Sequence, residues 1–319
     1  MEIVIKNSAR ADAFTTVFQH IKLFTEYITL VCNGSGVYMQ CMDNAHVAIV
    51  ELNLPADWFD IYELQPGCEN VRMGLNATFL HRILSSRDKD QQIQLLYSTE
   101  DADRLMIHLT CYTPDIVVVS EEPVVPEPKK GGGKKGGGGK SKKAATEEPA
   151  APISTASSAE GAGESVTAST TKAYFDKHFE LPLIDVEEEM MQIPDMDHTA
   201  ELAMQSAQFA NIITQLKMFG DSMDVQCSEE RIALASTSQE QGKMYVEIGI
   251  NDLSEFAIDE GADLSLSFSL SYLKNICAYN RISDSVRIKF SDSYPMQVAY
   301  LLGGEDAKLM FHLAPKIDD

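Results

Sequence analysis

The side chains that most often carry metal or redox chemistry are scattered through this sequence without a recognisable spacing. Zinc sites usually take cysteine and histidine pairs a few residues apart, and neither a CxxC nor an HExxH pattern occurs. We therefore expect no bound metal and no disulfide framework, with the thiols reduced. The residues concerned are His20, His46, His81, His108, His178, His198, His312, Cys32, Cys41, Cys68, Cys111, Cys227 and Cys277.

One acidic cluster has the composition of a divalent-cation site. It consists of Glu187, Glu188 and Glu189, followed closely by Asp195 and Asp197. A methionine pair and a proline interrupt it, whereas a cation site needs oxygen ligands that converge. A solvated linker is therefore the favoured interpretation.

Phosphate-binding and nucleophilic motifs are equally scarce. A glycine run at 131–139 resembles a phosphate loop only in composition, because no apolar strand precedes it and no helix follows. The sequence contains no GxxxxGK[ST] or GxSxG motif, and no GxGxxG that follows a predicted strand. We therefore predict no catalytic residues and no cofactor. The competing hypothesis of an enzyme would require a site that no motif reveals.

Charge and length limit the classes of protein to consider. The 319 residues suffice for two domains of ordinary size, and the formal net charge is −22. Such acidity argues against a protein whose whole surface coats nucleic acid, but it allows a few cations gathered on one inner surface. No apolar run approaches the roughly 20 residues that span a bilayer, and the N-terminus lacks a signal-peptide layout. We expect a soluble, intracellular protein with no membrane partner.

One segment differs from the rest in composition. Residues 120–172 are rich in Gly, Ser, Ala, Pro, Lys and Glu and contain no aromatic residue. Such a stretch buries too little apolar area to offset its ordering entropy, so it is predicted to be a disordered insertion. Its basic part, 129–143, could contact DNA or serve as a nuclear address, and a tolerated loop is the simpler hypothesis.

The remainder of the chain repeats itself. The segment from Ala13, AFTTVFQHIKLFTEYITLVC, parallels QFANIITQLKMFGDSMDVQC from Gln208, each typical of an amphipathic helix followed by strands. LNATFLHRILSS from Leu75 parallels FSLSYLKNICAY from Phe268 as a second short helix, and each is followed by a predicted β-hairpin. We therefore predict that the remainder of the chain consists of two tandem copies of one α+β unit. A domain-sized repeat indicates pseudo-symmetric assembly more than catalysis.

Three stretches resemble one family. They are SGVYMQCMDNAHVAIVELNL at 35–54, FELPLIDVEEEMMQIP at 179–194 and the C-terminal LAPKIDD at 313–319. They are similar to the eukaryotic-type DNA sliding clamps of the proliferating cell nuclear antigen (PCNA) family. The divergence and the insertion fit a viral or protist member.

The resemblance implies a fold and an assembly. We expect an α+β DNA-clamp fold with outer β-sheets and inner helices, closing as a homotrimeric ring. Domain 1 would span 1–119 and be completed by an edge strand at 174–182. A connector would span 183–198, and domain 2 would span 199–319. The trimer interface would involve Phe175, Phe179, Met244 and Tyr245.

The resemblance also implies contacts with DNA and with partner proteins. Duplex DNA would be encircled without sequence preference, facing Lys22, Arg82, Lys217 and Lys274, although neighbouring positions that are usually basic carry Ser or Thr here. DNA polymerase, clamp loader and other proteins would dock a short glutamine- and aromatic-containing peptide in an apolar groove. The groove residues implied are Met42, His46, Val47, Ile49, Met191, Ile193, Pro194, Pro295, Ala314, Pro315, Lys316 and Ile317.

The function expected is that of a polymerase processivity factor. Its location would be the nucleus, or a cytoplasmic replication site for a viral protein. Two alternative functions remain open. One is a subunit of a heterotrimeric checkpoint-type clamp, and the other is an acidic scaffold that mimics DNA without encircling it.

Overall fold

The computed structural model describes residues 1–111, 175–186, 190–194 and 196–316. The predictions made for the 120–172 insertion, for the glutamates at 187–189 and for Ile317 lie outside the described residues. Residues 1–112 and 174–319 belong to one compact unit, and the account below concerns that unit alone.

The two halves of this unit contain the same elements in the same order, which confirms the internal repeat. The first half comprises β1 (Glu2–Ile5), α1 (Ser8–Ile21), β2 (Tyr27–Asn33), β3 (Gly36–Met42), β4 (Ala48–Pro55), η1 (Ala56–Trp58), β5 (Ile61–Glu63), β6 (Asn70–Asn76), α2 (Ala77–Leu84), β7 (Gln91–Leu96), β8 (Arg104–Cys111) and β9 (Lys177–Pro182). The second comprises β10 (Ala200–Gln205), α3 (Ser206–Leu216), β11 (Ser222–Ser228), β12 (Ile232–Ser238), β13 (Gly242–Ile248), η2 (Ile250–Asp252), β14 (Glu255–Ile258), β15 (Asp263–Ser269), α4 (Leu270–Cys277), β16 (Ser285–Phe290), β17 (Met296–Leu301) and β18 (Lys308–Leu313).

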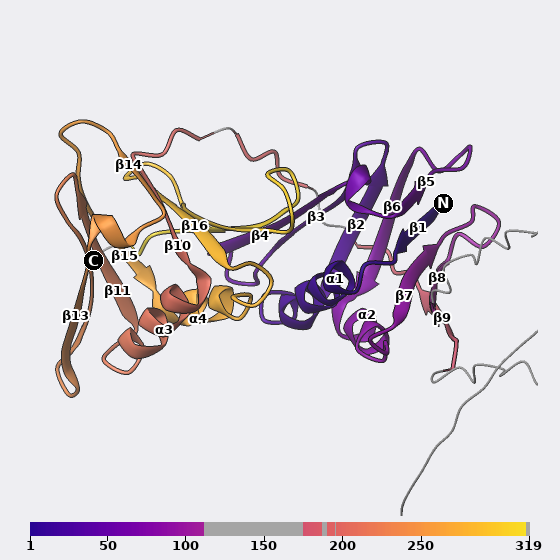
Figure 1. Ribbon diagram of the computed structural model, residues 1–319, viewed down its shortest axis with the longest axis horizontal. Coiled ribbons are helices and arrows are strands. Elements are labelled where there is room, and N and C mark those ends of the chain that lie inside the picture. Colours follow the sequence, from indigo (N-terminus) through magenta and orange to yellow (C-terminus); the bar gives the residue numbers. More distant parts are fainter. Residues whose placement is uncertain (112–174, 187–189, 195, 317–319) are drawn as a thin grey trace, which may run out of the picture. The chain divides into compact units, whose positions relative to one another are not determined.

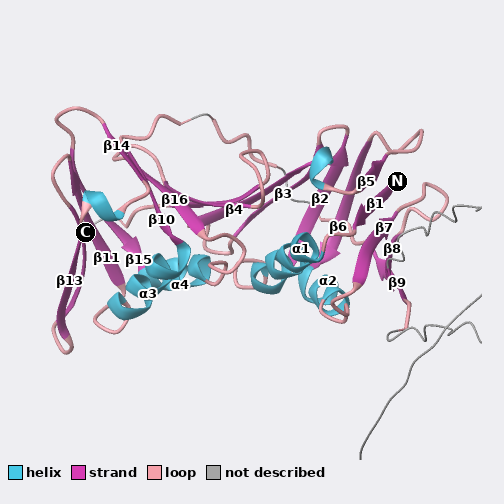
Figure 2. Cartoon of the chain, viewed as in Figure 1, coloured by secondary structure: helices cyan, strands magenta, loops and turns pink. Residues whose placement is uncertain are grey.

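The two helices of the first half, α1 and α2, begin where an asparagine side chain caps them. The Asn7 side chain accepts a hydrogen bond from the Arg10 backbone N–H at 3.1 Å, which starts α1 at Ser8. Asn76 caps α2 in the same way, through the N–H groups of Thr78 and Phe79. The helices pack in pairs, α1 with α2 and α3 with α4. Figures 1 and 2 show both pairs on the same side of the sheets.

Three sheets carry the helices. Their strand orders are β5-β1-β7-β8-β9, β14-β10-β16-β17-β18-β4-β3-β2-β6 and β13-β12-β11-β15. The nine-stranded sheet joins the two halves through the antiparallel pair β4–β18, in which Leu52 lies opposite Leu309 and Val50 opposite Phe311. None of the described helices is long and apolar enough to cross a membrane.

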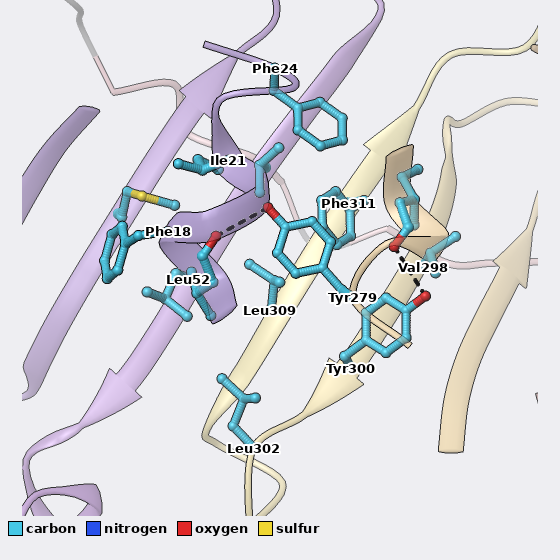
Figure 3. Packing of buried hydrophobic residues seen from close by; sticks show 14 of the residues in the cluster. Phe18, Ile21, Phe24, Leu52, Tyr279, Val298, Tyr300, Leu302, Leu309 and Phe311 are labelled. Carbon is cyan, nitrogen blue, oxygen red and sulfur yellow. Dashed lines mark hydrogen bonds between the residues drawn. The ribbon is translucent and has the colours of Figure 1, made fainter. Parts of the chain in front are cut away.

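The junction between the halves is a continuous core. Phe311 is fully buried and contacts the rings of Phe24, Tyr279 and Tyr300 (Figure 3). Each buried phenol finds a backbone acceptor: Tyr279 donates to the Val17 carbonyl at 3.3 Å, and Tyr300 donates to the Ile276 carbonyl at 3.2 Å. A buried tyrosine is favourable only when its hydroxyl is paired, and both phenols at this junction meet that condition.

Some sheet edges are covered by chain segments. Ile184 forms a β-bridge with Gly74 at the edge of β6, so close that a Cβ at Gly74 would lie 2.1 Å from the Ile184 carbonyl oxygen. The backbone N–H of Lys316 donates to the Ser267 carbonyl of β15 at 2.7 Å. Among the described strands, β9 and β13 each end a sheet. An open edge is a template for pairing with another chain.

Candidate partner-binding and DNA-facing sites

A cavity of 330 Å³ lies where the end of β3 meets the connector. Its wall brings together three of the predicted groove residues, Met42, His46 and Met191. Met191 keeps 38% of its surface exposed, so part of this apolar side chain is accessible at the cavity. The other lining residues are Thr29, Gln40, Cys41, Asp43, Asn44 and Met190.

Asp43 fixes the loop that forms one side of this cavity. Its carboxylate accepts hydrogen bonds from the backbone N–H groups of Ala45, Val47 and Ala48 at 2.9, 2.7 and 2.6 Å. The Tyr272 hydroxyl donates to the same carboxylate at 2.5 Å and ties the loop to α4. Burial acts to raise the pKa of Asp43, but these hydrogen bonds together hold it below its ordinary value.

Within the same loop, His46 adopts the left-handed backbone conformation, with φ of 58°. That conformation is sparsely populated by residues other than glycine and persists where the surroundings impose it. The His46 N–H donates to the Asp43 carbonyl at 3.0 Å, which closes the turn. The exposed His46 is one of the residues that line the cavity.

Replacing Asp43 by alanine is expected to lower the free energy of unfolding by about 2–3 kcal/mol, because buried N–H groups lose a charged acceptor. Asp224→Ala is the matched control, since Asp224 is exposed and its carboxylate accepts a 2.9 Å hydrogen bond from the Ser267 hydroxyl. Urea unfolding at pH 7 measures both. Equal losses in the two variants would contradict the assignment.

The contribution of the Asp43 carboxylate to the free energy of unfolding should fall as the pH is lowered. A carboxyl whose folded pKa is depressed stabilises the fold above its unfolded pKa of about 3.9, and this is lost as the pH falls through the folded value. The difference in stability between the parent and Asp43→Ala should therefore be largest near neutral pH and shrink below about pH 4.

The remaining predicted groove residues lie at several positions around this cavity. The Ala314 N–H donates to the Val47 carbonyl at 2.9 Å, so the C-terminal segment runs beside the Asp43 loop. Ile49 lies opposite both Met42 and His312 in the sheet. Four of the predicted groove residues do not line the cavity itself: Ile193, Pro295 and Pro315, which are half-buried, and Pro194, which is exposed. The exposed Lys316 side chain donates to the Ser222 hydroxyl.

The four predicted DNA-facing cations occupy two kinds of position. Lys22 and Lys217 lie at the C-caps of α1 and α3, one residue beyond each helix. Arg82 and Lys274 are exposed within the last turns of α2 and α4. Lys217 forms an ion pair with Asp221 and a 3.0 Å hydrogen bond to Ser271, so its charge is partly neutralised.

The predicted interface residues lie on or beside β9 and β13, which each end a sheet. Phe175 precedes β9 and is 88% exposed, and its carbonyl accepts a 2.7 Å hydrogen bond from Gln91. Phe179 is half-buried within β9. On β13, Met244 is half-buried and Tyr245 is 46% exposed. Exposed aromatic side chains beside an unpaired edge indicate an interaction surface.

The sequence analysis missed Gln40, Asp43 and Met190 as cavity residues. Alternation in β3 places Val37, Met39 and Cys41 toward the core, which predicts that Gln40 faces solvent. Gln40 is instead buried, because Met191 covers it from 151 residues further along the chain. No local signal in the sequence reports such a contact.

A duplicated unit of paired helices on β-sheets, with open strands at two sheet edges, defines the α+β DNA-clamp class. No three His, Cys, Asp or Glu side chains within the described part of the chain converge as a metal site. The family model for the N-terminal domain of proliferating cell nuclear antigen matches residues 5–120, and the model for its C-terminal domain matches residues 192–317. The chain belongs to the proliferating cell nuclear antigen family, whose members are non-enzymatic DNA sliding clamps.

Curated relatives align along most of their length. Proliferating cell nuclear antigen of Chaetomium thermophilum is 26% identical over 324 residues, covering 97% of this chain and 96% of the relative. Proliferating cell nuclear antigen 2 of Drosophila melanogaster is 23% identical over 292 residues, covering 91% and 89%. Proliferating cell nuclear antigen 2 of Plasmodium falciparum is 22% identical over 314 residues, covering 96% of each. The protein is thus a divergent sliding clamp that acts in DNA replication.

Proposed function

We propose that three copies of the chain close head to tail into a ring around duplex DNA, with β9 of one copy pairing with β13 of the next. The observation that supports this is that β9 and β13, one in each half of the repeat, each end a sheet, with exposed Phe175 beside β9 and exposed Tyr245 on β13. Pairing them in a closed ring leaves neither edge unpaired. A closed ring stays on DNA by topology, so its contacts with the duplex can be weak and sequence-independent.

The mass of the purified protein in solution tests the ring. A homotrimer has three times the protomer mass of 35.2 kDa. A subunit of a heterotrimeric clamp would remain a protomer when purified alone. Retention on circular DNA, with release after linearisation, separates an encircling clamp from an acidic scaffold that only mimics DNA. A persistent protomer that dissociates equally from both DNAs would refute the proposal.

The second part of the proposal concerns partner capture. The cavity formed by Met42, His46, Met190 and Met191 would receive a short peptide that carries a glutamine, an aliphatic residue and two aromatics. Methionine is flexible and polarizable, which suits a surface that accepts different partners. The C-terminal segment beside Val47 offers backbone groups for pairing with an extended peptide. DNA polymerase and clamp loader would be recruited in this way, in the nucleus or at a cytoplasmic viral replication site.

The DNA-facing assignment predicts a change in salt dependence. Among the described residues, Lys22 and Lys274 are the two lysines of the set that form no ion pair. Replacing both by alanine should reduce the slope of log K against log salt by roughly 2 for each copy whose two lysines contact the duplex. The control is Lys289→Ala with Lys308→Ala, which removes the same formal charge from β16 and β18. Anisotropy of labelled duplex DNA across a salt series measures both. An unchanged slope in the first variant would remove these lysines from the DNA-facing set.

A further inference from the structure

A buried polar cluster lies under the connector, on the outer face of the nine-stranded sheet. It consists of Tyr38 and Gln40 on β3, Glu51 on β4 and His312 on β18. Gln40 is 6% exposed, Glu51 8% and His312 3%. A buried charged group is costly unless it is paired and hydrogen-bonded, so this cluster should have a role that compensates for its cost.

The Glu51 carboxylate is the centre of the cluster. His312 Nε2 lies 2.8 Å from one carboxylate oxygen, and the Tyr38 hydroxyl donates to the other. Burial acts to raise the pKa of Glu51, but the hydrogen bonds from His312, Tyr38 and Gln40 and the charge of His312 outweigh it and lower the pKa. Glu51 is therefore ionised at neutral pH and accepts hydrogen bonds only.

An ionised Glu51 determines which way the Gln40 carboxamide faces. Gln40 Nε2 lies 3.1 Å from the Tyr38 oxygen and 3.4 Å from the Glu51 carboxylate. Only the NH₂ end of an amide can face a carboxylate favourably, so the carbonyl end must face the opposite way. That direction is toward the connector.

The connector is held by both ends of this amide. The Met191 N–H donates to Gln40 Oε1 at 2.7 Å, and Gln40 Nε2 donates to the Met191 carbonyl at 3.0 Å. One side chain thus satisfies both backbone groups of one connector residue, as a neighbouring strand would. Met191 and the preceding Met190 line the cavity opposite Met42 and His46.

We propose that Gln40, oriented by the Glu51–His312 pair through Tyr38, is a positioning residue that sets the affinity of the groove by fixing Met191. This inference rests on the proposed peptide-binding function. It adds that recognition depends on a buried polar cluster that acts through the Met191 backbone. Loss of the Gln40 contacts should leave the ring intact and loosen the connector wall of the cavity.

The test uses the full-length chain and an amphipathic probe, a fluorescein-labelled peptide with a glutamine, an aliphatic residue and two adjacent aromatics. Gln40→Glu places a second carboxylate beside Glu51 and removes the donor to the Met191 carbonyl. We expect about tenfold weaker binding, as the loss of one such buried contact implies. The matched control is Gln94→Glu, because Gln94 also donates to a carboxylate, that of Glu2 at 2.7 Å, on a different sheet. It should bind the peptide as the parent does.

Rescue distinguishes positioning from general destabilisation. Glu51→Gln alone should weaken binding about threefold, since the carboxylate no longer orients Gln40. In the Gln40→Glu background the same change should restore part of the lost affinity, because an amide at 51 can donate to a carboxylate at 40, which still accepts from the Met191 N–H. Gln40→Met removes both contacts without adding charge, and Glu51→Gln should not rescue it.

The outcomes separate the two proposals. Absence of peptide binding by the parent chain refutes the groove itself. Binding by the parent together with unchanged affinity in Gln40→Glu and Gln40→Met refutes the positioning role and leaves the groove intact. A Glu51→Gln change that weakens the Gln40→Glu variant further would also overturn the proposal. If Gln40→Glu fails to fold, the peptide affinity of the neutral Gln40→Met variant decides whether Gln40 has the positioning role.

Discussion

Phe311→Ala is expected to lower the free energy of unfolding by about 3–5 kcal/mol, the usual cost of truncating a fully buried phenylalanine. The side chain is enclosed by three aromatic rings contributed by both halves of the repeat, so the cavity left behind cannot collapse without moving the junction. Chemical denaturation with guanidinium chloride measures the loss.

Phe79→Ala is the matched control for this prediction. Phe79 is 50% exposed on α2, where its ring lies 5.4 Å from the Arg82 guanidinium carbon. Its truncation should cost no more than about 1 kcal/mol, because little apolar area leaves contact and an exposed cation–π pair is weak. Similar losses in the two variants would show that the junction is not the centre of the fold.

Phe175→Asp combined with Tyr245→Asp is expected to convert the proposed trimer into protomers. Each aromatic side chain, when buried between copies, would contribute about 1.5–3 kcal/mol, and each loss would weaken the contact about 10- to 150-fold. The added carboxylates also bring like charge to a chain whose net charge is already −22. Light scattering after size exclusion should show the mass fall toward 35.2 kDa.

The control for assembly is Tyr294→Asp. Tyr294 is 40% exposed in the turn before β17, away from β9 and β13 in the sheet order, and it receives the same chemical change. It should leave the mass unchanged. If the double variant still has the mass of a trimer, the contact between copies lies elsewhere.

The elements of the fold were predictable from sequence because their signals are local. Apolar residues at helical spacing in α1, here Phe14, Val17, Phe18 and Ile21, are all buried against the sheet. Alternation predicted the hairpins β7–β8 and β16–β17, and both form. The repeat then followed from matching one half against the other.

The site was only partly predictable, because it depends on contacts between distant segments. Met42, His46 and Met191 were inferred from a resemblance, and the structure brings them to one cavity. Gln40 and Asp43 escaped notice, since an alternating strand and a turn give the same pattern whether or not another segment covers them. The positions of Lys22 and Lys217 beyond their helices depend on where a final hydrogen-bonded turn ends, which propensity does not fix.

The β4–β18 pairing has a consequence for loading onto DNA. Six residue pairs, from Lys308–Asn53 to Leu313–Ala48, join the halves of a protomer, and an aromatic core lies beneath them. For a duplex to enter a closed ring, one of the contacts that close the ring must break. The weakest of these contacts will break first. We expect that contact to be an interface between protomers and not the β4–β18 pairing. Each protomer would then move as a rigid body when the ring opens, without bending at the junction between its two halves.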